Sequence, residues 1–271
     1  MGRELFPKYP AVVKKADNIL GYSLENLCLE DPNNCLDQTK YTQPALYIVN
    51  ALSYLDEMEK GGTKPTYVAG HSLGEYNALL AADVFNFETG LQLVKRRGHI
   101  MGQASNGKMA AIIGINELEV RSILTENKLD MIDIANLNTV QQNVISGPKK
   151  DILKAQRIFL NLDVKFVILD VSGAFHSRNM EKAKIEFAHD IQKISFKQPQ
   201  ISVISNYTAK CYNENEVENN LIEQMTSPVR WVESIQFIRS KGIEDIKQIG
   251  PGNVLKGLIR KIKREYLAEL R

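Results

Sequence analysis

The sequence predicts an α/β protein in which a smaller α+β domain interrupts a larger domain. Three observations lead to this prediction. A short apolar run passes through a glycine-rich turn into a helix at 66–82, short strands alternate with two helices at 109–170, and longer helical segments resume after residue 176. Of the 271 residues, 44 % are hydrophobic and 24 % are charged, which is enough to bury a substantial core.

The first part of the chain is predicted to form helix, turn, strand and helix. Residues 41–59 place apolar side chains at helical spacing, and the glycines and proline of 61–65 end that helix. The short apolar run 66–69 is typical of a buried strand, and 75–82 is rich in the helix-forming residues Ala and Leu. A further helix is expected over 87–103.

The middle of the chain has a different pattern, which begins after Asn106 and Gly107. Short strands are expected at 109–115, 131–137, 143–148 and 164–170, and helices at 117–127 and 150–162. This order predicts a small antiparallel sheet covered by two helices, with a ferredoxin-like topology. We therefore assign 107–171 to a small inserted domain, and 1–106 and 172–271 to a larger α/β domain.

The last third of the chain is predicted to complete the larger domain. Helices are expected over 178–194, 217–225 and 232–241, and strands at 201–205 and 245–249. Neither an internal repeat nor a low-complexity linker separates these segments.

The sequence Gly70-His-Ser72-Leu-Gly74 has the form of a nucleophile elbow. It lies between a predicted strand and a predicted helix, and its small flanking residues allow a tight, strained turn that lifts the serine hydroxyl clear of the sheet. The first turn of the helix points free N–H groups at any oxyanion that forms beside Ser72. A bare Gly-x-Ser-x-Gly pattern also occurs in ordinary turns, but the flanking elements favour a nucleophile. We therefore expect the larger domain to be α/β-hydrolase-like.

A serine nucleophile needs a base to take its proton, and four histidines are available. His71 adjoins Ser72 on the strained turn and is expected to point elsewhere. His99 and His189 lie in predicted helices among charged neighbours and are expected to be solvated or packed. His176 lies in a loop of small residues where the two domains rejoin, and it is the predicted base.

The composition bears on partners and location. Lys plus Arg number 34 against 32 Asp plus Glu, so the net charge of +2 provides no broad field to attract nucleic acid or an anionic membrane. The N-terminus has no apolar signal core, and no stretch reaches the roughly 18 to 20 apolar residues that a membrane span needs. The three cysteines, an odd number without metal-ligand spacing, indicate free thiols and no metal site. A cytoplasmic protein is expected.

Four segments, taken in order, resemble one known family. They are GHSLGEYNALLAA at 70–82, KRRGHIMGQA at 95–104, VSGAFHS at 171–177 and IGPGNVLKGL at 249–258. These segments, and nearly the whole chain with them, are similar to the malonyl-CoA:acyl carrier protein transacylases. The resemblance is strongest to the free-standing acyltransferases that serve bacterial modular polyketide synthases lacking acyltransferase domains of their own.

The resemblance implies an acyl-carrier-protein S-malonyltransferase of polyketide or fatty acid biosynthesis. A malonyl group would pass from malonyl-CoA, which is a substrate, to the phosphopantetheine thiol of an acyl carrier protein. The reaction would follow a ping-pong mechanism through an ester on Ser72, and no cofactor is expected.

Carried over by motif, the resemblance implies Ser72 as the nucleophile, His176 as the general base and Arg97 as the residue that holds the malonyl carboxylate. A carboxylate in a desolvated pocket needs a positioned cation, and a guanidinium binds it through two parallel hydrogen bonds. The lysine and arginine just before it are expected on the solvated face of the helix. A backbone carbonyl near Gln224, seven residues before Trp231, would orient the imidazole in place of an aspartate.

Two further positions are implied to set selectivity. Malonyl-selective members of the family resemble this chain in carrying a bulky Phe just before the His-Ser step and an aliphatic residue after the nucleophile. Here these residues are Phe175 and Leu73. A large Phe leaves little room for a 2-methyl branch, a discrimination of roughly 1 to 3 kcal/mol, so malonyl is expected over methylmalonyl.

The start of the chain departs from the family pattern. Family members open with a strand that ends in Phe-Pro-Gly-Gln-Gly, whose Gln N–H is the second oxyanion donor, whereas this sequence begins MGRELFPKYP. We expect either a longer natural product or a truncated, weakly active form, since losing such a donor costs about 2.7 to 4 kcal/mol. Two rival functions follow. One is an acyl hydrolase acting on carrier proteins, which Arg97 argues against because stalled chains lack a malonyl carboxylate, and the other is a truncated binding module.

Overall fold

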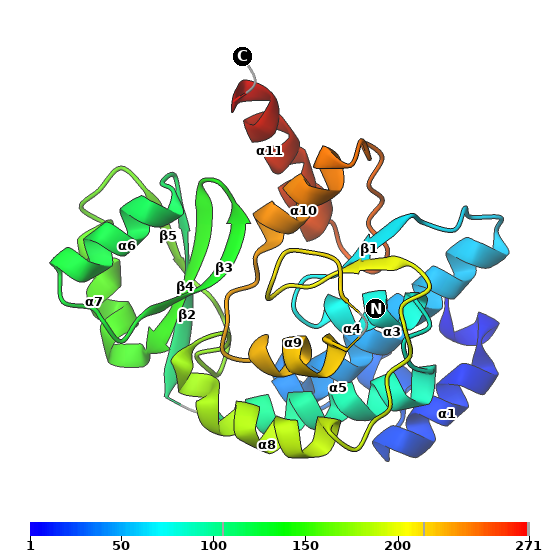
Figure 1. Cartoon of the computed structure of the whole chain (residues 1–271). Helices are drawn as coiled ribbons and strands as arrows, with labels where there is room; N and C mark the ends of the chain where they lie inside the picture. Colours follow the sequence, from blue (N-terminus) through cyan, green and yellow to red (C-terminus); the bar gives the residue numbers. More distant parts are fainter. Residues whose placement is uncertain (105, 214, 270–271) are drawn as a thin grey trace.

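The computed structural model describes residues 1–104, 106–213 and 215–269 and has a mixed α/β architecture (Figure 1). Its elements are η1 Phe6–Lys8, α1 Pro10–Leu20, α2 Leu24–Leu29, η2 Cys35–Asp37, α3 Thr39–Glu59, β1 Tyr67–Ala69, α4 Gly74–Ala81, α5 Phe87–Gly102, β2 Gly107–Ile113, α6 Glu117–Glu126, β3 Asp133–Thr139, β4 Gln142–Pro148, α7 Lys149–Phe159, β5 Lys165–Ile168, η3 Arg178–Met180, α8 Glu181–Ile191, β6 Ser202–Ile204, α9 Val217–Glu223, α10 Trp231–Ser240 and α11 Val254–Glu269.

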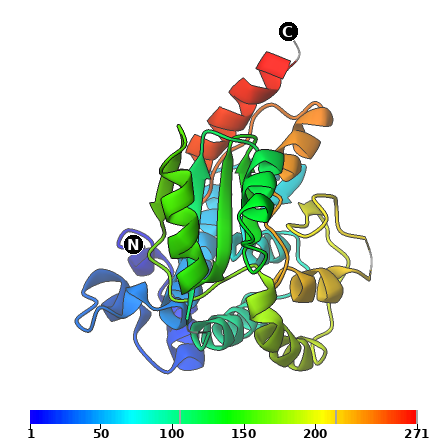
Figure 2. The same ribbon diagram turned by 90° about the vertical axis from the view of Figure 1, so that its left-hand side faces the viewer.

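The middle of the chain forms a four-stranded antiparallel sheet in the order β3-β4-β2-β5. Helices α6 and α7 cover one face of it, in front of the strands in Figure 2. Apolar side chains from both helices and the strands share one core, among them Ile112, Val120, Ile145, Ile152 and Phe159. The predicted order of strands and helices in this part of the chain is confirmed.

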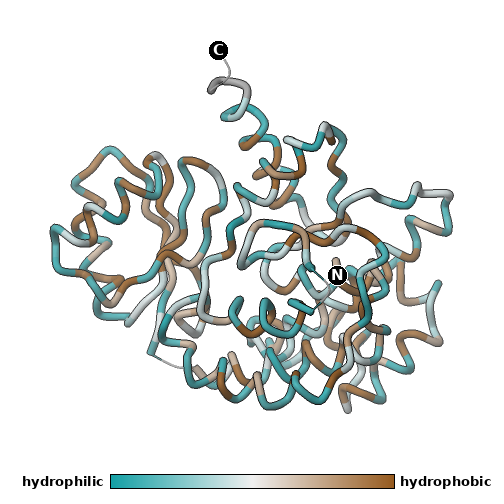
Figure 3. Tube along the Cα trace, viewed as in Figure 1, coloured by the Kyte–Doolittle hydropathy of each residue, from teal (hydrophilic) through white to brown (hydrophobic). Residues whose placement is uncertain are grey.

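A second sheet consists of β1 and β6, which run parallel and pair Val68 with Val203. The whole four-stranded sheet lies between these two strands in the chain, so this sheet pairs segments that are far apart in the sequence. Helix α4 packs against both strands, and α3 and α5 pack against α4; their buried side chains, such as Tyr47, Leu79 and Leu91, belong to the larger core. Along the helices in Figure 3, hydrophilic and hydrophobic residues are mixed over short distances, as expected for helices that bury one side.

The strand predicted at Asp245–Ile249 is wrong, because these residues form no β-bridge. Ile243 and Ile246 pack against the core of the small sheet, and Lys247 forms a salt bridge with Glu57. The alternating apolar residues therefore reflect a segment that packs one side against the core. A strand also needs a neighbouring backbone with which to form hydrogen bonds. The helix predicted over 178–194 is also shorter, since it opens as η3 and α8 ends at Ile191.

The small sheet is tied to the segment that precedes α10. The Leu137 N–H donates to the Val229 carbonyl, and the Val229 N–H donates to the Ala135 carbonyl, both at 2.9 Å. Helix α10 then packs on β3. Among the described residues no helix has the length and apolar content that crossing a membrane requires.

The N-terminus of α6 makes a testable contribution to stability. Asn116 Oδ1 accepts from the Glu119 N–H, and Glu119 Oε2 accepts from the Asn116 N–H, which forms a capping box. Asn116→Ala should lower the free energy of unfolding by about 1 kcal/mol. A denaturant titration measures this, with the exposed Leu118→Ala on the same helix as the control, expected within about 0.5 kcal/mol of the parent. Equal losses in both variants would contradict the capping role.

Candidate active site

Ser72 stands at the apex of the turn between β1 and α4. Its φ of 50° lies in the left-handed region, which a residue with a side chain rarely adopts. A Cβ at Gly70 would lie 1.9 Å from the carbonyl carbon and oxygen of Gly74, so position 70 has room only for glycine. A Cβ at Gly74 would meet nothing within 4 Å. The first glycine of the motif therefore makes the tight turn possible, and the second is not sterically required.

The strand next to β1 supplies the residue that holds this turn. Asn206 follows β6 and is buried. Its Oδ1 accepts from the Ser72 N–H, and its Nδ2 donates to the Gly70 carbonyl, both at 2.7 Å. One side chain thus bonds to both arms of the turn and offsets the strain at Ser72.

His176 lies against the serine. Its Nε2 is 2.7 Å from Ser72 Oγ, and its Nδ1 is 2.8 Å from the Gln224 carbonyl oxygen. A carbonyl only accepts, so Nδ1 carries the proton and the Nε2 lone pair faces the hydroxyl. Burial first, and the nearby positive charge of Arg97 second, lower the pKa of His176 to about 3, although the bond to Gln224 acts in the opposite direction. The imidazole is therefore neutral near pH 7 and able to accept a proton.

The other histidines do not contact the serine. All four lie in the described part of the chain, and only His176 hydrogen-bonds Ser72. His71 points away and hydrogen-bonds Asn138 Oδ1 of β3 through its Nε2 at 2.9 Å. His99 and His189 are exposed on α5 and α8.

Arg97 points inward from α5 and is only 1 % exposed. Its Nη2 donates to Ser72 Oγ at 3.1 Å and to Gln224 Oε1 at 2.9 Å, and its Nη1 donates to Gln43 Oε1 at 2.7 Å. The guanidinium also lies over the ring of Tyr76, with its Cζ 5.6 Å from the ring centroid. The site therefore holds a buried cation directly beside the serine hydroxyl.

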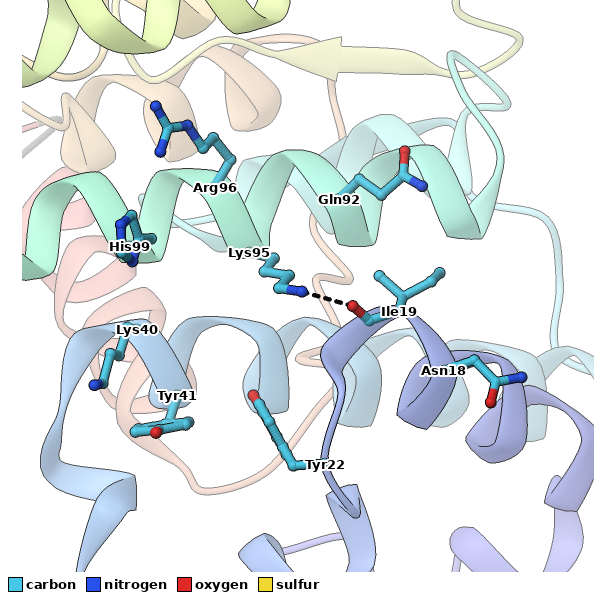
Figure 4. Close-up of a pocket in the computed structure, with 9 residues that line it drawn as sticks. All are labelled: Asn18, Ile19, Tyr22, Lys40, Tyr41, Gln92, Lys95, Arg96 and His99. Atoms are coloured by element: carbon cyan, nitrogen blue, oxygen red, sulfur yellow. Dashed lines mark hydrogen bonds between the residues drawn. The ribbon is translucent and has the colours of Figure 1, made fainter.

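The two basic residues before Arg97 face outward, as their position on the helix predicts. Lys95 is exposed and donates to the Ile19 carbonyl, and Arg96 forms salt bridges with Glu186 and Asp190. A cavity of about 670 Å³ lies on this outer side of α5, between α5, the end of α1 and the start of α3 (Figure 4). Both cations already have hydrogen-bond or salt-bridge partners, and no residue of the serine site lines the cavity.

Leu73 and Phe175 are both buried in the larger core. The Leu73 N–H has no backbone or side-chain acceptor among the described residues, which leaves it free to donate to an oxyanion beside Ser72. The Phe175 ring lies close to Gly173, where a Cβ would approach it to 2.7 Å. The ring therefore folds back onto the loop that carries His176.

A second groove has a volume of about 360 Å³. It is lined by Arg121, Asp133, Ile134, Arg178, Glu181, Thr226 and Pro228. These residues come from the small sheet and its helix α6, from the segment after His176 and from the segment after Gln224. The groove thus lies where the small sheet meets the two segments that carry and orient the imidazole.

Four polar residues of the site were not predicted from the sequence. They are Gln43, Glu75, Asn206 and Tyr212. Burial raises the pKa of Glu75 to about 7, against the opposing effects of three hydrogen bonds and of Arg97. The one local signal was Glu75 itself, an acidic residue in the first turn of a largely apolar helix. The hydrogen-bond partners of all four residues lie far away in the chain.

The fold and the site together define a class of protein: a mixed α/β chain with a serine–histidine pair at a strand–turn–helix apex and a buried arginine beside it. The family model described as acyl transferase domain matches residues 1–259. The chain belongs to this acyl transferase family.

Relatives and solved structures agree with this assignment. The chain is 50 % identical over 267 residues to the polyketide biosynthesis malonyl CoA-acyl carrier protein transacylase PksC of Bacillus subtilis, covering 98 % of this chain and 93 % of PksC. It is 52 % identical to the polyketide biosynthesis protein PksE of the same organism but spans only 35 % of it. The crystal structure of a malonyl CoA-acyl carrier protein transacylase from Burkholderia pseudomallei superposes with a TM-score of 0.95 at 44 % identity, covering 97 % of this chain and 93 % of that one. The resemblance seen in the four sequence segments is confirmed.

The contrast between the two glycines of the motif gives a prediction. Gly70→Ala should displace Ser72, and a shift of about 1 Å in a reacting group costs on the order of a hundredfold in rate. Gly74→Ala has room for its methyl group and should react like the parent. The measurement is the rate at which a fluorophosphonate labels the serine in each folded variant. Similar slowing in both variants would mean that the turn is not the constraint.

The lowered pKa of His176 gives a second prediction. Imidazole ¹⁵N NMR should show His176 neutral, with its proton on Nδ1, at every pH between 8 and about 5. The folded-state pKa lies below that of the unfolded chain. The stability from this group is therefore complete above about pH 6.5 and is lost as the pH falls toward 3. An imidazolium signal from His176 at pH 6 would contradict this account.

Proposed function

We propose that this chain transfers a malonyl group from malonyl-CoA to the phosphopantetheine thiol of an acyl carrier protein through an ester on Ser72. The observation that carries the proposal is the buried Arg97 guanidinium 3.1 Å from the Ser72 hydroxyl, which is itself hydrogen-bonded to His176. A cation in this place suits an acyl group that bears a carboxylate. The names of PksC and of the Burkholderia protein support the same substrate and acceptor.

In the first half-reaction Ser72 Oγ attacks the thioester carbonyl carbon while His176 Nε2 takes the hydroxyl proton. The Leu73 N–H stabilises the resulting oxyanion. The carbon–sulfur bond then breaks, and His176 returns the proton to the departing coenzyme A thiolate. Malonyl-Ser72 and neutral His176 remain.

In the second half-reaction His176 takes the proton of the phosphopantetheine thiol, whose sulfur attacks the ester. The bond to Ser72 Oγ breaks, and the proton passes from His176 back to the serine. The groove of about 360 Å³, whose lining residues Arg178 and Thr226 follow His176 and Gln224 by two positions in the chain, is the route that we propose for the phosphopantetheine arm. The Gln224 carbonyl keeps Nδ1 protonated in both halves, although it stabilises the imidazolium less than a carboxylate would.

The selectivity residues belong to the same proposal. Leu73 and Phe175 are buried, and each is next to a reacting residue in the sequence. In this proposal they limit the space for a branched acyl group, so malonyl is favoured over methylmalonyl. Membership of a polyketide pathway is supported by the 50 % identity to PksC.

We further propose the finer description of the fold. The larger domain, 1–106 and 172–271, is α/β-hydrolase-like around the elbow at Ser72. The inserted domain, 107–171, is ferredoxin-like, which is supported by its strand–helix–strand–strand–helix–strand order and by the sheet order β3-β4-β2-β5.

Intact-protein mass spectrometry after brief exposure to malonyl-CoA tests the function. The parent should gain one malonyl mass, Ser72→Ala should gain none, and Arg97→Ala should be acylated about ten- to a hundredfold more slowly, because a charge-assisted contact is lost. Arg96→Ala is the matched control, since the side chain of Arg96 faces outward on the same helix and should not affect the rate.

The same experiment distinguishes the rival functions. Rapid loss of the malonyl mass to water, without transfer to a carrier protein, would indicate a hydrolase. A parent that never gains the mass would indicate a binding module and would overturn the proposal.

A further inference from the structure

Behind the nucleophile lies a buried carboxylate that takes no part in the proposed proton transfers. Glu75 stands in the first turn of α4 and is fully buried. Its Oε1 accepts from the Asn206 backbone N–H at 2.9 Å and from the Tyr212 hydroxyl at 2.6 Å. Its Oε2 accepts from the side-chain amide of Gln224. Burying an ionised carboxylate costs free energy unless hydrogen-bond donors and nearby positive charge compensate it.

Gln224 connects this carboxylate to the buried cation. Its Oε1 accepts from Arg97 Nη2 at 2.9 Å, while its Nε2 donates to Glu75 Oε2 and, at 3.1 Å, to the Ser72 carbonyl. In the opposite orientation the amide would turn its NH₂ toward the guanidinium and its oxygen toward the carboxylate, and both contacts would be repulsive. The two oxygens of Glu75 accept hydrogen bonds from three donors, one of them the Gln224 amide, and this arrangement fixes the orientation of Gln224.

Arg97 has no carboxylate bound directly to it among the described residues. Its acceptors are Gln43 Oε1, Ser72 Oγ and Gln224 Oε1, all of them neutral, and its Nε has none. Burial lowers the pKa of Arg97, and the negative charge of Glu75 beyond the Gln224 amide acts in the opposite direction, in favour of the protonated guanidinium. A direct ion pair would give stronger compensation but would occupy donors that a substrate carboxylate needs.

We infer that Glu75 is a positioning residue for carboxylate recognition. Through Gln224 it keeps Arg97 aligned and electrostatically compensated without covering it, so that an acyl group with a free carboxylate is preferred over one without. The inference rests on the proposed function, because it explains how the same site selects malonyl over acetyl.

Glu75→Gln tests this inference with almost no change in shape. The new amide must turn its NH₂ either toward the Asn206 N–H or toward the Gln224 NH₂, so a donor faces a donor in either orientation. We expect the acylation rate of Ser72 with malonyl-CoA to fall about ten- to a hundredfold and the rate with acetyl-CoA to fall much less. Glu25→Gln is the control, because it makes the same change at an exposed glutamate in the first turn of α2, which does not belong to the site.

The readout is the ratio of the malonyl to the acetyl acylation rate, which a loss of folded protein does not alter. A lower ratio in Glu75→Gln, with the ratio of Glu25→Gln unchanged, is the expected result. A parent-like ratio in Glu75→Gln would overturn the inference even if both rates fall. The proposed function fails separately, when the parent itself forms no malonyl adduct.

A double variant, Glu75→Gln with Gln224→Glu, keeps the test decisive if the single variant does not fold. It exchanges donor and acceptor, so the hydrogen bond between positions 75 and 224 is restored, while the bond from position 224 to the Ser72 carbonyl is lost. The carboxylate at position 224 then pairs directly with Arg97. We expect a thermally stable protein whose malonyl-to-acetyl ratio stays at least about tenfold below that of the parent. Recovery of the parent ratio in this double variant would show that indirect compensation is not what the site requires.

Discussion

The structure depends on a guanidinium that is buried before any substrate arrives. Taking a cation out of water costs several kcal/mol unless its donors are satisfied, and Arg97 meets that cost with neutral acceptors on Gln43 and Gln224 and with the face of Tyr76. The same charge helps to lower the pKa of His176, so the residue placed to receive an anionic acyl group also keeps the base unprotonated. Substrate binding and proton transfer are thus linked by one electrostatic constraint.

Both of the residues that face each other in the site have a strained backbone. Ser72 and His176 have φ of 50° and 55°, where a side chain costs on the order of 1 to 3 kcal/mol. Asn206 bonds to both arms of the first turn, and Gln224 holds the imidazole of the second. The 2.7 Å contact between the strained pair is therefore held by neighbours that do not react.

Local patterns explain what could be predicted from the sequence. The turn at Ser72 and the succession of strands and helices along residues 107–171 depend on patterns within a few residues. Arg97 was predicted from a resemblance to a known motif. Asn206 and Glu75 could not be found in this way, because the partner of Asn206 lies 134 residues away and that of Glu75, in Gln224, lies 149 residues away. Residues 245–249 have the periodicity of a strand but form no hydrogen-bonded pair with another backbone segment among the described residues. Such pairing depends on the tertiary fold and cannot be seen in a local pattern.

The small sheet takes part in the geometry of the base. Its strand β3 exchanges two backbone hydrogen bonds with Val229, five residues beyond Gln224, whose carbonyl orients His176. The same strand receives His71, the neighbour of the nucleophile, on the side chain of Asn138. The inserted sheet is therefore anchored both to the turn that carries the serine and to the segment that orients the histidine. A shift of the sheet would therefore act on the neighbour of the nucleophile and on the segment that orients its base together.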